Sequence, residues 1–196
     1  MNLATHNSMS YLEPLRWWMR LLLPLARCQT KNLRQQWEEG VRLFDLRVRW
    51  NESRCRWDFA HGPVTFEGMD IYGACTRLCI WSEDAGEKAH VRLILEYNRK
   101  PSESYIPSLF ADLAFHLSEL YPELHFFEFR QKWNWHQVVL DKEPPAFRQC
   151  VGSMSGKWYG KLWPWLYARR HNEAILNEAA IRSASYPDEF TMIDFI

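Results

Sequence analysis

The apolar residues of this chain repeat with two different periods, and the two periods predict two kinds of element. Apolar residues three or four positions apart mark one helix face over residues 105–120: Ile106, Leu109, Phe110, Leu113, Leu117 and Leu120. Further helices are predicted over residues 33–39, 66–81 and 164–180. Short runs rich in β-branched and aromatic residues predict strands over residues 1–5, 41–48, 54–60, 90–96, 124–129, 147–153 and 190–196.

The order of these elements predicts the class of fold. Strands alternate with helices, so we expect an α/β fold with a largely parallel sheet. Residues 154–167 are rich in Gly, Trp and Pro and predict a long loop. The 196 residues contain no repeat, low-complexity segment or linker, so one domain over residues 1–196 is the simplest organisation.

Charge and composition exclude some classes of partner. The chain has 24 basic and 24 acidic residues and a formal net charge of zero. Binding to nucleic acid needs a basic face, so we expect no nucleic-acid partner. Residues 1–8 contain neither a basic stretch nor an apolar core of a signal peptide, and we therefore expect a cytoplasmic protein.

The segment over residues 11–27 is apolar but is interrupted by charge. Arg16, Arg20 and Arg27 divide the run and Pro24 breaks it, so it does not provide the ~20 apolar residues that cross a bilayer. It has two interpretations of equal weight: an amphipathic segment lying on a membrane surface, or a helix that caps the core. The 11 tryptophans are assigned mostly to packing, with three clusters assigned to a half-wet rim: Trp17-Trp18, Trp158-Tyr159 and Trp163-Trp165.

The five cysteines do not predict a disulfide framework or a metal site. They are Cys28, Cys55, Cys75, Cys79 and Cys150. An odd number cannot pair completely within one chain, and no second pair completes a zinc set with Cys75 and Cys79. We therefore interpret them as reduced, mostly buried thiols.

Four residues in the first third of the chain offer the chemistry of phosphoryl transfer. His6 and His61 can each change protonation near neutral pH, so together they can act as a general base and a general acid. Arg47 offers a permanently charged fork suited to a phosphate. Asp45 lies two positions before Arg47 on one predicted strand, so both side chains point to the same side. A structural ion pair is the alternative interpretation of Asp45 and Arg47.

The order of these residues resembles the catalytic X region of phosphatidylinositol-specific phospholipases C. The matching pieces are a Thr-His-Asn-Ser turn at residues 5–8, a Gln-rich helix at 33–39, a Gly-Val-Arg-x-x-Asp-x-Arg strand at 40–47 and a His-Gly at 61–62. The detailed match covers about residues 1–65. The resemblance implies a compact, distorted (β/α)8 TIM-type barrel with mostly parallel strands, although ~200 residues is the usual minimum for such barrels.

The resemblance also implies an activity and roles for single residues. His6 would take a proton from a neighbouring hydroxyl of the lipid head group, and His61 would protonate the departing glycerol oxygen. Arg47 would hold the phosphate, and Asp45 would hold Arg47 or the attacking hydroxyl. Asp194, near the end of the predicted last strand, resembles the aspartate that orients the first histidine in the metal-free bacterial branch. The products would be a cyclic phosphate and diacylglycerol.

The resemblance offers two expectations about metal. Asn7, Asp45 and Glu96 match the calcium-dependent branch of the family, but Arg47 stands where that branch has a second strand acid. A guanidinium repels a calcium ion, which needs 6–8 oxygen ligands, so we expect no metal cofactor. Asn7 stands where the metal-free branch has an aspartate that supports the general acid.

Substrate and activity are less constrained by the sequence. The phosphodiester can be a phosphatidylinositol-like lipid or another lipid-linked or soluble diester. Candidate head-group ligands in the later part of the chain are Arg130, Arg148, Lys157 and Tyr159, beside Asn7 and Glu96. A third hypothesis is a catalytically impaired barrel that binds membranes or a partner.

Overall fold

A curved, mostly parallel sheet forms the centre of the protein. The structure is a computed structural model that describes residues 1–96, 105–131, 137–138 and 145–196, with the side chains of 128–131, 137–138 and 161 left undescribed. Its strands are β1 (Asn2–Thr5), β2 (Glu13–Pro14), β3 (Val41–Asn51), β4 (Arg56–His61), β5 (Val64–Glu67), β6 (His90–Leu95), β7 (His125–Gln131), β8 (Gln137–Val138), β9 (Phe147–Cys150) and β10 (Phe190–Ile193).

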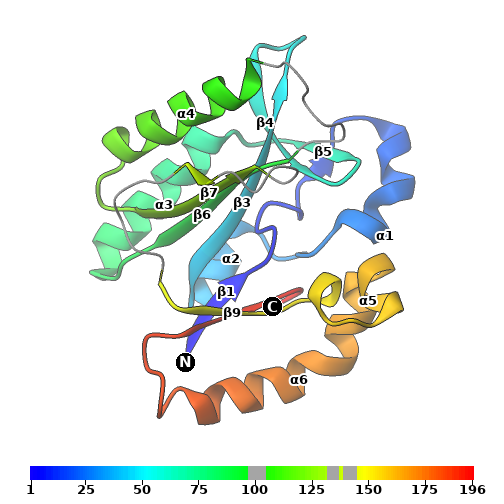
Figure 1. Cartoon of the computed structure of the whole chain (residues 1–196), viewed down its shortest axis with the longest axis vertical. Coiled ribbons are helices and arrows are strands. Elements are labelled where there is room, and N and C mark those ends of the chain that lie inside the picture. The colour runs from blue at the N-terminus through cyan, green and yellow to red at the C-terminus, as the bar shows by residue number, and fades with distance from the viewer. Residues whose placement is uncertain (97–104, 132–136, 139–144) are drawn as a thin grey trace.

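Parallel pairing joins the strands in the order β9-β10-β1-β3-β6-β7. The far end of the long strand β3 leaves this sheet and pairs antiparallel with β4. Further antiparallel pairing joins β4 to β5 and β5 to β2. The strand that carries His61 therefore enters from a hairpin and not from a parallel crossover. Figure 1 shows this hairpin extending away from the curved sheet.

Helices cover the outside of the sheet. They are η1 (a 3-10 helix, Trp17–Leu22), α1 (Leu23–Ala26), α2 (Leu33–Glu38), α3 (Ile71–Ala85), α4 (Ile106–Leu120), η2 (a 3-10 turn, Gly152–Met154), α5 (Trp158–Leu162) and α6 (Pro164–Arg182). In Figure 1, α3 and α4 lie on the side of β6 and β7, whereas α6 lies along β9 and the C-terminal strand. No helix among the described residues is long and apolar enough to cross a membrane.

Side chains from distant strands meet inside the curved sheet. Phe127 of β7 and Phe147 of β9, on the two edges of the parallel order, have ring centroids 5.8 Å apart. His90 of β6 and Phe190 of β10 approach to 5.0 Å. One buried cluster joins the interior residues Ala4, Leu43, Phe127, Val151, Phe190 and Met192. The sheet therefore curls into a barrel, although no hydrogen bonds between described residues join its two edges.

Local sequence signals explain most of the helix boundaries. Asn32 caps α2 and forms a reciprocal capping box with Gln35, and the chain leaves the helix at Gly40 with a φ of 87°. Asp70 caps α3 through the backbone N–H of Gly73, and Gly86 ends it in the left-handed conformation.

Three expectations about elements need correction. Residues 66–81 do not form one helix, because the hairpin continues through Glu67 and the helix starts only after the Asp70 cap. The expected long loop at 154–167 contains the short helix α5 and the start of α6. The last strand ends at Ile193, so Asp194 follows the strand instead of lying within it.

Candidate active site

Polar side chains line the end of the barrel where the parallel strands finish. Interior positions recur every second residue along each strand, as the pleat requires. On β1 the interior Ala4 is followed by His6, on β3 Leu43 is followed by Asp45 and Arg47, and on β10 Met192 is followed by Asp194. His6, Asp45 and Asp194 are buried, and chemistry in parallel barrels is located at this end.

The turn after β1 is fixed by hydrogen bonds in which its backbone takes part. His6 N–H donates to the carbonyl of Ile193 (3.1 Å), and Asn7 N–H donates to Asp45 Oδ2 (3.1 Å). Asn7 has a φ of 47°, a left-handed conformation that asparagine tolerates better than most residues. Buried Gln36 of α2 donates to the carbonyl of Ser8 (2.8 Å). The Gln-rich helix thus supports the turn that presents His6.

His6 is oriented by a buried carboxylate. Its Nδ1 lies 2.6 Å from Asp194 Oδ1, while the other carboxylate oxygen accepts from the backbone N–H of Gly152 (2.8 Å). Burial raises the pKa of Asp194, but His6 and the hydrogen bonds outweigh it, so the net pKa lies below its ordinary value. Because an ionised carboxylate can only accept, Nδ1 carries a proton and a neutral His6 presents a lone pair on Nε2.

Arg47 lies between two buried carboxylates. Its Nε is 2.9 Å and its Nη2 is 2.8 Å from Asp45 Oδ2, and its Nη1 is 3.8 Å from Glu96 Oε2. Burial raises the pKa of Asp45, but Arg47 and then Arg92 lower it further, and the carboxyl stays ionised. Burial lowers the pKa of Arg47, but the two carboxylates raise it above its ordinary value. The guanidinium is therefore a fixed cation aimed at the barrel mouth.

His61, at the end of β4, reaches the same place from the hairpin. Its ring meets that of His6 edge to face, with centroids 5.5 Å apart. Glu96 Oε1 accepts from the backbone N–H of Gly62 (2.7 Å), and Gly62 turns the chain with a φ of 53°. The strand-end acid Glu96 thus anchors the turn that carries His61.

The protonation state of His61 follows from its neighbours. Nδ1 lies 2.7 Å from the carbonyl of Ala26, which can only accept, so Nδ1 carries a proton. Partial burial and then the nearby charge of Arg47 lower the pKa of His61 from 6.5 to about 3. His61 therefore rests as a neutral imidazole whose Nε2 lone pair is available.

Two further groups belong to this cluster: Cys28, which lies in no sequence motif, and Asn7 of the Thr-His-Asn-Ser turn. Cys28 is fully buried, and its Sγ lies 3.6 Å from His61 Nδ1. Burial, followed by the charge of Asp194, raises the pKa of its thiol well above the ordinary value. The Nδ2 donor of Asn7 is also buried and makes no hydrogen bond to the described part of the chain. A buried donor without a protein partner at a site of this kind is suited to a substrate oxygen.

The later candidates for head-group binding lie apart from this cluster. Lys157 is exposed at the start of α5, and the hydroxyl of Tyr159 bonds His171 Nε2 (3.0 Å). Arg148 pairs with Glu178 of α6 (2.5 Å). Arg130 is on β7, but its side chain lies outside the described residues. Among described residues, no hydrogen bond or ion pair joins Arg148, Lys157 or Tyr159 to the side chains around His6 and His61.

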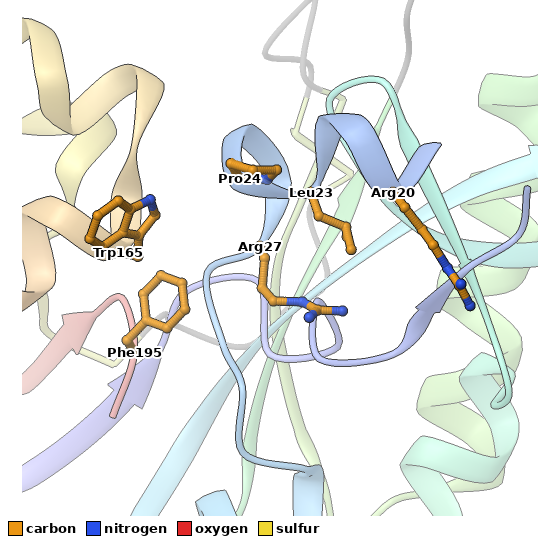
Figure 2. A pocket seen from close by; sticks show the side chains of 6 residues that line it. All are labelled: Arg20, Leu23, Pro24, Arg27, Trp165 and Phe195. Atoms are coloured by element: carbon orange, nitrogen blue, oxygen red, sulfur yellow. The ribbon is translucent and has the colours of Figure 1, made fainter. Parts of the chain in front are cut away.

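A pocket and an apolar rim border the site. The pocket, about 340 Å³, is lined by Arg20, Leu23, Pro24, Arg27, Trp165 and Phe195. Figure 2 shows the rings of Trp165 and Phe195 close together on one side and the η1–α1 side chains on the other. Phe195 and Arg27 are chain neighbours of Asp194 and Cys28, although neither histidine lines the pocket. Beside it, Trp17 and Leu21 are 79% and 80% exposed.

Solved structures resemble the fold of this chain, although the sequence alone has no match. No protein-family model and no curated protein matches the chain. A phosphatidylinositol-specific phospholipase C from Listeria monocytogenes is 18% identical, with a TM-score of 0.60 over 98% of this chain and 87% of that one. A variant of the Staphylococcus aureus enzyme is 11% identical, with a TM-score of 0.63 over 98% and 84%.

A further S. aureus structure, concerned with that enzyme's membrane binding, is 12% identical, with a TM-score of 0.54 over 97% and 70%. The chain has the fold of bacterial phosphatidylinositol-specific phospholipases C. The predicted distorted barrel is therefore confirmed, and so is the resemblance that suggested it. At these identities the likeness concerns the fold, and the chemistry has to be argued from the side chains of this chain.

Proposed function

We propose that this protein cleaves a phosphatidylinositol-like lipid at its phosphodiester and releases a cyclic phosphate and diacylglycerol. The observation that carries the proposal is the meeting of two histidines beside a buried arginine. His6 follows β1 and His61 ends β4; each has Nδ1 held by the protein, and Nε2 of His6 lies 4.0 Å from Asp45 Oδ2. Two such imidazoles suit a displacement in which one oxygen loses a proton and another gains one.

The first step uses the His6 side of the site. A head-group hydroxyl next to the phosphate attacks phosphorus while His6 Nε2 takes its proton. Asp194 stabilises the imidazolium that forms, as a carboxylate does for a catalytic histidine. The rings touch edge to face, so the phosphorus lies at their outer edges and not between them.

Charge on the phosphoryl oxygens is met by Arg47, which Asp45 and Glu96 hold in place. Fixed cations of this kind are usually the largest electrostatic contribution in phosphoryl transfer. Asn7 Nδ2 supplies a further donor for a substrate oxygen. In the second step the glycerol oxygen leaves with a proton from His61 Nε2. The bound phosphodiester anion favours the protonated form of His61, which the free site disfavours.

We infer that this reaction requires no metal cofactor. Asp45 and Glu96 are the acids that the calcium-dependent enzymes would use, but the guanidinium of Arg47 is 2.8 Å from one and 3.8 Å from the other. A cation placed between these carboxylates would meet a fixed positive charge. The residues present therefore do not fit a calcium site, and Arg47 takes over the task of neutralising the phosphate.

The direct test is turnover of a panel of phospholipids and water-soluble phosphodiesters by chelator-treated protein. We expect phosphatidylinositol to be cleaved to a cyclic phosphate, identified by phosphorus NMR, and the rate to survive strong chelation. Cleavage of a soluble diester alone would support the second hypothesis about substrate. Loss of activity with chelator and recovery with calcium alone would contradict the metal-free mechanism. No turnover of any diester would favour an impaired barrel that only binds.

We also propose that the η1–α1 segment docks the protein on a membrane. Trp17 and Leu21 expose a large apolar surface beside the pocket, and Arg20 is placed to meet lipid phosphates. Peripheral binding would bring the barrel mouth to the lipid head group. The S. aureus enzyme, which shares this fold and whose membrane binding has been the subject of a solved structure, is consistent with this proposal.

Replacing Trp17 and Trp18 by Ala should weaken vesicle binding and lipid turnover while leaving a soluble diester and the melting temperature nearly unchanged. Phe115→Ala on α4 is a matched control, because that ring is 59% exposed on a helix far from η1 in Figure 1. A buried tryptophan would cost ~3–5 kcal/mol on truncation. A large fall in melting temperature, with both activities lost together, would show that the segment is part of the core.

A further inference from the structure

Three side chains at the barrel mouth carry donors that metal ions prefer. His6, Cys28 and His61 each contribute one ligand atom, and these atoms lie within 4.8 Å of one another. A tetrahedral zinc site has metal–ligand bonds of ~2.0–2.3 Å, so its donors lie ~3.3–3.8 Å apart. The Sγ of Cys28 is already 3.6 Å from His61 Nδ1. To bring all three donors to this spacing, the partly buried His61 ring has to turn and give up its hydrogen bond to the carbonyl of Ala26.

The surroundings of His6 match those of a metal-binding histidine. Its Nδ1 donates to the carboxylate of Asp194, which is the carboxylate–histidine arrangement that orients zinc ligands, and its Nε2 lies 4.0 Å from Asp45 Oδ2. Asp194 is also close enough to Cys28 to change the pKa of the thiol. Through its hydrogen bond to His6 it can therefore orient the ligand set.

Charge and softness select the kind of ion. Asp45, Asp194 and Glu96 bring three negative charges to the cluster, and Arg47 and Arg92 bring two positive ones. A divalent ion that binds the thiol displaces its proton to solvent, so the cluster gains one positive charge and becomes nearly neutral. A thiolate with two imidazoles favours zinc-like ions over calcium or magnesium, which prefer oxygen.

We propose that His6, Cys28 and His61 bind a thiophilic divalent cation such as Zn²⁺ and that the bound ion switches the catalytic centre off. The inhibitory effect rests on the proposed function, because the ion takes the Nε2 lone pair of His6 that would accept the substrate's proton and fixes the ring of His61 through its Nδ1. The binding itself does not depend on it. Catalysis without metal and inhibition by zinc then follow from the same two histidines.

Metal-stripped protein titrated with Co²⁺, a spectroscopic substitute for Zn²⁺, tests the binding without any substrate. We expect one ion per chain, tetrahedral d–d bands and a thiolate-to-cobalt charge-transfer band. Cys28→Ala should remove that band and weaken Zn²⁺ binding by ~100-fold or more, since even indirect partners of a ligand contribute 10–100-fold. Cys28→Ser is the second variant if the Ala cavity impairs folding. Cys55→Ser, which removes an exposed thiol on the β3–β4 turn, should bind like the wild type.

Measurements of turnover with and without Zn²⁺ distinguish a failure of this inference from a failure of the proposed function. Zn²⁺ should inhibit lipid turnover, chelator should restore it, and the inhibition should weaken in Cys28→Ala in parallel with Zn²⁺ affinity. Unchanged Zn²⁺ affinity in both Cys28 variants would overturn the site, and so would loss of binding in Cys55→Ser. Binding with the charge-transfer band in a protein without turnover would uphold the site and remove the proposed function. Turnover that bound Zn²⁺ does not affect would uphold the proposed function and overturn the inhibitory effect.

Discussion

The two histidines at the barrel mouth touch each other, but their neighbours differ in charge. Nδ1 of His6 donates to an ionised carboxylate, Asp194, that is itself held by the backbone of Gly152. Nδ1 of His61 donates to a neutral carbonyl, that of Ala26, beside a neutral thiol and within the field of Arg47. The two imidazoles, with ring centroids 5.5 Å apart, therefore have surroundings of opposite charge: a carboxylate beside His6 and a guanidinium near His61.

This difference assigns the two halves of a proton-transfer reaction. A carboxylate partner stabilises the imidazolium that forms when His6 takes a proton, so the His6 side suits a base. A neutral partner with a nearby cation leaves His61 unprotonated until an anion enters the site. His61 then gives up its proton readily, which suits an acid that acts only on a bound phosphodiester.

The largest expected effect is on turnover, and it distinguishes His6 from His61 by how the loss in each variant depends on the leaving group of the substrate. His6→Ala should reduce turnover of every substrate by up to ~10⁴-fold, because no other described group is placed to deprotonate the nucleophile. His61→Ala should reduce lipid turnover by ~10²-fold or more but spare an aryl phosphodiester, whose leaving group departs without a proton. Rates of the two variants on both substrates check this prediction. Equal losses on both substrates in His61→Ala would remove the distinction between the two sides.

A smaller effect tests the partner of His6. Asp194→Asn keeps the shape of the side chain but removes its charge, so lipid and aryl substrates should both slow, by up to ~10³-fold. Asp58→Asn is the matched control, because Asp58 is also buried but bonds Asn51 and Arg56 outside the site. The control should lose stability and keep its rates. If Asp194→Asn slowed the lipid alone, Asp194 would belong functionally with His61.

The comparison also explains how far the sequence could predict this site. The His6 side is set by strand periodicity, since His6, Asp45, Arg47 and Asp194 all follow interior positions on parallel strands. The family resemblance implied the barrel, and strand periodicity then predicted that Asp45 and Arg47 point to the same side of their strand. Glu96 was recognised as a strand-end acid, but the structure shows it anchoring the Gly62 turn, a contact that no spacing reveals.

The His61 side depends instead on tertiary contacts of irregular segments. Ala26 and Cys28 lie at and just after the end of α1, and they reach His61 only because η1 and α1 fold back over the barrel mouth. Pro24 breaks the predicted amphipathic segment over residues 11–27, but nothing in its pattern indicated where Ala26 and the following Cys28 would lie. Cys28 was interpreted as an ordinary buried thiol, and its burial is confirmed while its contact with His61 was missed.

The smallest expected effect concerns stability and follows from the neutral state of His61. Its pKa is lowered from 6.5 in the unfolded chain to about 3 in the folded protein, first by burial and then by Arg47. Below pH 6.5 the unfolded chain therefore binds a proton that the folded protein excludes. The contribution of neutral His61 to the free energy of unfolding is therefore complete above pH 6.5. It decreases as the pH falls toward about 3, by at most about 1.4 kcal/mol per pH unit for one group.

His61→Asn should flatten this dependence, as measured by urea unfolding at a series of pH values above the range in which Asp45 and Asp194 protonate. His90→Asn is the matched control at the other end of the barrel, where burial and then His125 lower the pKa of His90 to about 4. In His90→Asn the free energy of unfolding should also depend less steeply on pH, but only between about pH 6.5 and about pH 4, and turnover should not change. A wild-type slope retained in His61→Asn would mean that His61 is charged in the free site. The two sides of the site would then no longer differ in the way that assigns one the base and the other the acid.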